Sequence, residues 1–228
     1  SNSSSDNFNK TDILVSLLKD TLNEYSYPAY LAGLHFELYQ HMRGVTVKIS
    51  GYNDKQSNLL IKIINALKVA KFEVGRFETI KERLQRQLEN ASDKKPFQQA
   101  ISKAQNILIS PSWSESHRLK ALKNLTFEKL NTYREDFLQE LEAVLLVNGN
   151  VTRASSLNIA NHIDAFLLQD IKHTHVDRAE INKLSANKVW ASGIDVDHTD
   201  TGFVYYLQGE NKSISEQAKF MLLSLIHI

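Results

Sequence analysis

Histidines near carboxylates are the residues of this sequence that could bind a metal ion, because the chain has eight histidines and no cysteine. The densest group is His173, His175 and Asp177. Residues two apart on a strand share one face, so the two histidines could converge on one ion. A catalytic zinc needs three protein ligands, and nothing in this polar stretch fixes a third one. We therefore assign no metal ligand to this chain.

The other histidines fit ordinary structural positions. His35 falls on the polar side of a predicted strand, His41 in the turn that follows, and His162 on a predicted helix. Asp195, Asp197 and Asp200 form an acidic cluster in a turn rich in Asp and Thr. The cluster lacks the twelve-residue ligand pattern of a calcium loop. Zinc-peptidase motifs, a Gly-x-Ser-x-Gly motif, phosphate loops and dinucleotide motifs do not occur. The residues alone predict no catalytic or cofactor-binding site.

Composition sets broad bounds. The 228 residues are 42% hydrophobic and 23% charged, with a formal net charge of +1. This balance is typical of a globular chain and does not indicate a nucleic-acid partner. No apolar run reaches the roughly 18 residues that a membrane span needs, and without cysteine there are no disulfides. The chain opens on the polar SNSSSDNFN without a Met, so we expect it to be cut from a longer protein.

Residues 34–56 organise the predicted fold. Apolar and polar residues alternate in residues 34–40 and again in residues 45–52, which is the pattern of strands with one buried face. Gly44, in the short link between them, can adopt a positive φ and close a hairpin. The sequence therefore predicts two antiparallel strands followed at once by a helix.

Helical periodicity surrounds this hairpin. Apolar residues recur every three or four positions in residues 12–32, 57–70, 72–92, 96–109, 114–122, 126–141 and 152–169. Residues 1–9 are expected to be a polar loop. Residues 143–147, AVLLV, form a continuous apolar run typical of a buried strand. We expect this strand and the hairpin to share one antiparallel-dominated sheet, covered on one face by the first, second and last helices.

The remaining residues predict a second unit. Residues 170–187 have no clean period and are interpreted as a linker. Residues 188–196 and 202–208 alternate again and predict a separate hairpin, and Ser213 or Ser215 caps a last helix. The fold class is therefore α+β, with helices packed on one face of an antiparallel-dominated sheet.

Three stretches together resemble the insulinase/pitrilysin family of zinc metallopeptidases. The first contains LLKDTLNEYSYPAYLAGL followed by GYNDKQ, the second is RFETIKERLQRQLENASDKKPFQQA, and the third is ELEAVLLVNGNVTRASSLNIANHID. The resemblance covers about residues 11–166 and, more weakly, 188–222. In that family four α+β units form two halves around a closed chamber, and the first unit carries the zinc motif His-x-x-Glu-His.

The resemblance implies a fragment of the non-catalytic C-terminal half. Residues 1–169 would be the third unit, 170–187 a linker and 188–228 the truncated start of the fourth. The whole protein would be a zinc metalloendopeptidase that degrades peptides, with its zinc bound outside this fragment. This chain would then be inactive alone and would enclose peptide substrates together with the catalytic N-terminal half. No catalytic, cofactor-binding or metal residue is carried over onto it.

Three alternatives stay open. The chain could instead be an inactive family member that acts as a binding or assembly module. Its compartment is undetermined between periplasm and cytoplasm, with the periplasm favoured for a bacterial pitrilysin-like protein. Residues 223–228, LSLIHI, match the translation of a sequencing-library transposon end, so we expect the native sequence to stop near Leu222. The alternative is a genuine continuation of the last helix, because Leu-Ser-Leu-Ile fits an apolar face.

Overall fold

The structure is a computed structural model, and it forms two compact units. It describes residues 4–52, 55–169, 171–173, 175–176, 178–185, 188–209 and 213–225. The first unit comprises Ser1–Ala91 and Pro111–Glu180, and the second Ser92–Ser110 and Ile181–Ile228. The fold class is α+β, as the sequence predicts. The division into 1–169, 170–187 and 188–228 as units of a longer protein stays a prediction.

Helix α1 (Ser5–Leu31) is the central element of the first unit. It starts seven residues earlier than the predicted Asp12, so the expected polar loop is wrong for residues 5–9, while residues 1–3 lie outside the described part of the chain. The Ser4 hydroxyl accepts the Asn7 N–H at 3.1 Å and caps the helix. Asn9 is fully buried, and its side-chain amide donates to the Arg118 carbonyl at 2.7 Å, which offsets the cost of burying a polar group. A polar sequence is thus held in the helix by partners distant in sequence.

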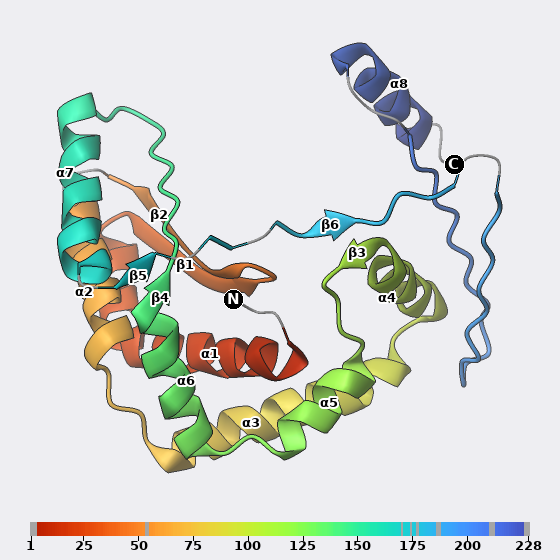
Figure 1. The fold of residues 1–228 in the computed structure, drawn as a ribbon, viewed down its shortest axis with the longest axis horizontal. Coiled ribbons are helices and arrows are strands. Elements are labelled where there is room, and N and C mark those ends of the chain that lie inside the picture. Colours follow the sequence, from red (N-terminus) through yellow and green to blue (C-terminus); the bar gives the residue numbers. More distant parts are fainter. Residues whose placement is uncertain are drawn as a thin grey trace. The chain divides into compact units, whose positions relative to one another are not determined.

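Strands β1 (Leu34–His41) and β2 (Gly44–Gly51) form the predicted hairpin. They pair antiparallel, with Leu34 opposite Gly51 and His41 opposite Gly44. Gly51 has a φ of 116°, and a Cβ at this position would lie 2.0 Å from the carbonyl oxygen of Gly33. Only glycine allows this close approach at the open end of the hairpin. Figure 1 shows α1 (red) against the hairpin.

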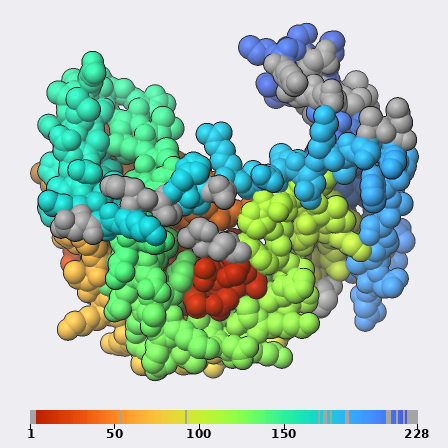
Figure 2. Space-filling model, viewed as in Figure 1, coloured from red at the N-terminus to blue at the C-terminus, as the bar shows by residue number. Residues whose placement is uncertain are grey.

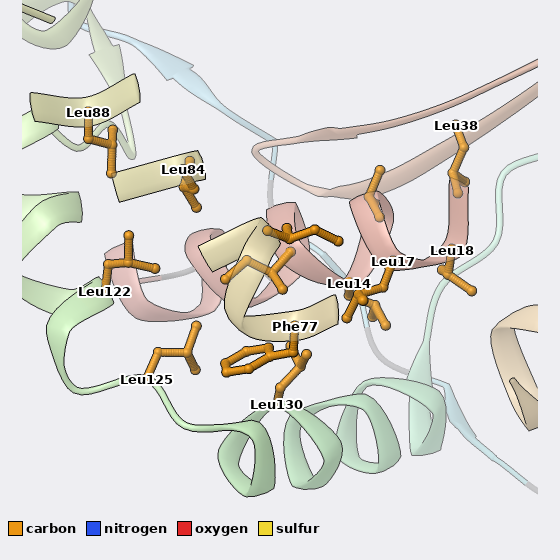
Figure 3. Packing of buried hydrophobic residues seen from close by; sticks show 13 residues of the cluster. Leu14, Leu17, Leu18, Leu38, Phe77, Leu84, Leu88, Leu122, Leu125 and Leu130 are labelled. Carbon is orange, nitrogen blue, oxygen red and sulfur yellow. The ribbon is translucent and has the colours of Figure 1, made fainter. Parts of the chain in front are cut away.

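Helices α2 (Gln56–Val69), α3 (Val74–Glu89), α5 (Glu115–Lys123), α6 (Phe127–Gln139) and α7 (Arg153–Ile163) complete the first unit. A π-helical turn, Asp164–Leu168, continues α7. The apolar stripes of α1, α3, α5 and α6 meet β1 in one core (Figure 3), whose buried members are Ile13, Leu14, Val15, Leu17, Leu18, Leu38, Phe77, Ile80, Leu84, Leu88, Leu122, Leu125 and Leu130. The predicted periodicity of α1 and α3 therefore identifies the core faces correctly.

The predicted third strand of the sheet is wrong. Residues 143–147 adopt no regular secondary structure, and Val144 and Leu146 are 80% and 88% exposed. The green segment after β4 lies at the surface in Figure 2. Its neighbours are two short strands that pair in parallel, β4 (Glu140–Leu141) and β5 (Lys172–His173). An apolar run becomes a buried strand only beside another strand, and no strand of the described residues extends alongside it.

The second unit is built on α4 (Pro96–Leu108), with Pro96 in its first turn as predicted. The other elements are β3 (Ile109–Ser110), β6 (Glu180–Ile181), which begins in the first unit, and α8 (Ile214–Leu225). The predicted hairpin of residues 188–196 and 202–208 is wrong, because both stretches are irregular and largely exposed.

Local contacts hold this irregular chain without a strand ladder. Lys103 Nζ donates to the Gly193 carbonyl at 2.8 Å, and the Gln208 side chain bonds the backbone of Asn182 and Leu184. Of the suspected foreign tail 223–228, the last three residues lie outside the described part of the chain.

Candidate binding surface on the hairpin

The solvent-facing side of the β1–β2 hairpin gathers polar and aromatic side chains. The strand alternation sends alternate residues away from the core, and cross-strand pairing brings them together. We call this side the outer face; its residues are His35, Glu37 and Tyr39 on β1 and Thr46, Lys48 and Ser50 on β2. The opposite side, with Leu34 and Leu38, is buried against the core of the first unit.

One ion pair crosses the middle of the outer face. Lys48 Nζ lies 3.0 Å from Glu37 Oε1, and both side chains are more than half exposed. The hydrogen bond to Glu37 raises the pKa of Lys48, so this amine is charged at neutral pH. An exposed pair of this kind contributes little to stability. Its two charges are therefore available to exchange partners with a charged ligand.

An aromatic border adjoins the outer face where α1 meets the hairpin. Tyr30 and Tyr52 are 60% and 75% exposed. The Tyr30 and His35 rings meet edge to face, with their centroids 5.0 Å apart. The Tyr52 ring covers Gly33 so closely that a Cβ there would lie 2.7 Å from ring atoms. Exposed aromatic rings beside charges form a surface suited to binding peptide segments.

Of the three metal candidates, only part lies among the described residues. His173 lies on β5, His175 is an exposed residue just beyond it, and Asp177 lies outside the described residues. His175 Nδ1 is 3.6 Å from Glu142 Oε1, which is an ion-pair distance when the imidazole is protonated. Within the described residues, no three His, Asp or Glu side chains gather closely enough to hold a metal ion.

The other candidates take local structural roles. His162 Nδ1 lies 2.7 Å from the Asn158 carbonyl one turn earlier, and its ring stacks on Phe166. In the acidic turn, the Asp200 N–H donates to His198 Nδ1 at 2.9 Å. His162, His198 and Asp200 are all exposed.

Sequence reasoning missed the cluster at the tip of the hairpin. Arg43 donates to the Val176 carbonyl at 2.9 Å and lies 3.4 Å from Glu142 Oε2. These partners are 133 and 99 residues away in the chain, so no local spacing could have predicted the cluster.

No helix in the described part of the chain is long and apolar enough to cross a membrane.

Comparison with known proteins defines the class. The profile described as the middle or third domain of peptidase M16 matches residues 1–121, which is more than half of the chain. The chain therefore belongs to the peptidase M16 family, the insulinase/pitrilysin family of zinc metallopeptidases, as the sequence resemblance implies.

Several relatives support this assignment. Human insulin-degrading enzyme is 34% identical over 167 residues, which are 73% of this chain and 16% of that protein. Insulin-degrading enzyme-like 2 of Arabidopsis thaliana is 30% identical over 230 residues, covering 95% of this chain and 23% of that protein. The Schizosaccharomyces pombe protein named "Putative zinc protease mug138" is 32% identical over 149 residues, which are 65% of this chain and 15% of that protein. The chain thus spans less than a quarter of these relatives.

A solved structure agrees with the fold. Pitrilysin is similar with a TM-score of 0.65 and 22% identity, over 74% of this chain and 18% of that chain. At this identity the likeness concerns the fold alone.

Proposed function

We propose that this chain is a non-catalytic, chamber-forming part of a zinc-dependent metalloendopeptidase that degrades peptides. The observation that carries the proposal is the match to the middle or third domain of a zinc-peptidase family over residues 1–121. The relatives are peptidases several times longer than this chain. The zinc would be bound by another part of the whole protein, and no step of the chemistry is assigned to residues of this one.

The outer face of the hairpin would form part of the chamber wall. Its Glu37–Lys48 pair and the Tyr30 and Tyr52 rings are exposed, so they are free to meet a peptide. A wall with these charges and rings would influence which peptides enter the chamber and how they are oriented in it. The catalytic N-terminal half would complete the enclosure, and peptide substrates would be the partners.

The test uses the full-length protein and reverses one charge of the outer face. Glu37→Lys removes the ion pair and leaves two adjacent amines beside the aromatic border. For charged peptides we expect KM to change about threefold to tenfold, in opposite directions for acidic and basic peptides. Turnover of a short neutral peptide and the zinc content should stay unchanged.

A matched control separates the wall from general charge effects. Glu78 is an exposed acid on α3, so Glu78→Lys makes the same charge change away from the outer face and should leave KM unaltered. Equal KM changes in both variants, or none in either, would contradict the chamber-wall role. A full-length protein without a zinc motif or peptide turnover would favour a binding or assembly module.

A further inference from the structure

Three segments that are distant in sequence meet at the tip of the hairpin. Glu142 follows β4 and accepts the Val176 N–H at 2.9 Å through Oε2. The Val176 carbonyl in turn accepts a hydrogen bond from Arg43 Nη2 at 2.9 Å, and the same nitrogen lies 3.4 Å from Glu142 Oε2. The three groups form a closed ring of contacts, and the Arg43 and Glu142 side chains are each about 30% exposed. This ring fastens the hairpin tip to the chain around β4 and β5.

His41 holds the turn that presents Arg43. The backbone N–H of Arg43 donates to His41 Nδ1 at 3.2 Å, so this nitrogen has to be unprotonated. Protonation of His41 removes that acceptor and adds a positive charge next to the Arg43 guanidinium. Burial and the Arg43 charge both lower the pKa of His41. The folded turn therefore binds a proton less readily than the open one, and its stability falls as the pH drops through the ordinary histidine range.

Other charged groups of these elements also face the ring. His175 Nδ1 lies 3.6 Å from Glu142 Oε1, on the carboxylate that Arg43 contacts through Oε2. Lys172 and Glu140 pair with each other at 2.9 Å and balance their charges. Asp177 lies outside the described residues.

We propose that His41, Arg43 and Glu142 form a pH-sensitive latch, which holds the hairpin tip against the β4–β5 region near neutral pH and releases it on acidification. Release would loosen residues 140–147, which include the exposed apolar run. The inference is independent of the proposed function, because it concerns a conformational equilibrium within one unit of this chain.

A second histidine turn gives an internal reference. His198 accepts the Asp200 N–H at 2.9 Å in the same geometry, but the charge beside it is opposite, with Asp200 Oδ2 at 3.8 Å from Nδ1. The two turns therefore share one hydrogen-bond geometry and differ in the sign of the neighbouring charge.

The test is hydrogen exchange of the whole chain, followed by mass spectrometry between pH 7.5 and 5.5 and corrected for intrinsic exchange rates. Peptides that carry the Arg43 and Val176 N–H groups, which donate to His41 and Glu142, should exchange about threefold to tenfold faster at the acid end, the equivalent of one hydrogen bond. His41→Asn keeps an acceptor for the Arg43 N–H, as in an Asx turn, but cannot titrate. Its exchange at these two N–H groups should not depend on pH.

Two further variants make the assignment decisive. Arg43→Met should leave the Val176 N–H open to exchange at both pH values, whereas His175→Asn should keep most of the pH dependence. Exchange that is independent of pH in the unaltered chain would overturn the latch. So would a full acid response in His41→Asn, or its loss in His175→Asn alone.

Discussion

Arg134 on α6 fastens the C-terminal end of α2. Its guanidinium donates to three backbone carbonyls of that end, Leu67 at 3.1 Å, Ala70 at 2.5 Å, and Lys68. The group also lies over the Phe72 ring, 5.1 Å from its centroid. The last carbonyls of a helix have no partners within the helix, so one side chain here supplies what the α2 backbone lacks. Arg134→Met keeps the apolar stem and removes all three donors.

The expected cost follows from the three hydrogen bonds. A buried bond from a charged donor contributes about 1.5–3 kcal/mol, and a cation at a helix C-terminus about 0.3–1 kcal/mol. Arg134 is half-buried, and water replaces part of what is lost at the exposed carbonyls. We therefore expect Arg134→Met to lower the free energy of unfolding by about 2–4 kcal/mol. This is a large share of a typical stability of about 5–15 kcal/mol.

Urea denaturation of the purified chain, followed by circular dichroism, measures this loss. The midpoint should fall while the denaturant slope stays the same. Arg134→Lys keeps the charge but cannot span three carbonyls, so its loss should be intermediate. Arg86 is an exposed arginine on α3, and Arg86→Met should stay within about 0.5 kcal/mol of the unaltered chain. A similarly small effect for Arg134→Met would refute the fastening role.

Four other substitutions test the packing and its charges. Ile63 is 3% exposed, whereas Leu67 is only partly buried. In urea denaturation, Ile63→Ala should lower the free energy of unfolding by about 2–5 kcal/mol and Leu67→Ala by clearly less. Equal losses would show that the buried face of α2 is misassigned. The Tyr133 hydroxyl shares a buried 2.7 Å hydrogen bond with a threonine of α1, so Tyr133→Phe should cost about 1 kcal/mol, and a neutral result in the same assay would contradict it. Arg76 lowers the pKa of Asp20, so the pair stabilises above the ordinary Asp pKa of about 3.9, and this is lost as the pH falls through the lower folded value. Arg76→Met should therefore flatten the acid side of a melting-temperature profile, and an unchanged profile would argue against the pair.

The periodicity of apolar residues was sufficient to predict the hairpin and the buried face of α3. The alternation of residues 34–40 and 45–52 was sufficient for the hairpin, and the stripe of α3 identified its buried face. The start of α1 was predicted too late, because Asn9 is polar in sequence but buried through its bonds to Arg118. Such a partner, more than a hundred residues away, leaves no trace in the local pattern.

The prediction of a strand at residues 143–147 was wrong for a related reason. Its composition favours a strand, but a strand exists only with a neighbour, and pairing is not encoded in the run itself. The tip cluster at Arg43 was likewise invisible, since its contacts are 99 and 133 residues distant. The resemblance to a peptidase family supplied the functional class, which the residue types alone did not.

Zinc content and peptide turnover, measured side by side on the isolated chain and on the full-length protein, test the central claim. We predict that the isolated chain binds no stoichiometric zinc and does not cleave a quenched-fluorescent peptide. The full-length protein should hold one zinc and lose its turnover when a chelator removes the metal. One-to-one zinc binding by the isolated chain, with turnover that a chelator abolishes, would contradict the account and place the active site among these 228 residues.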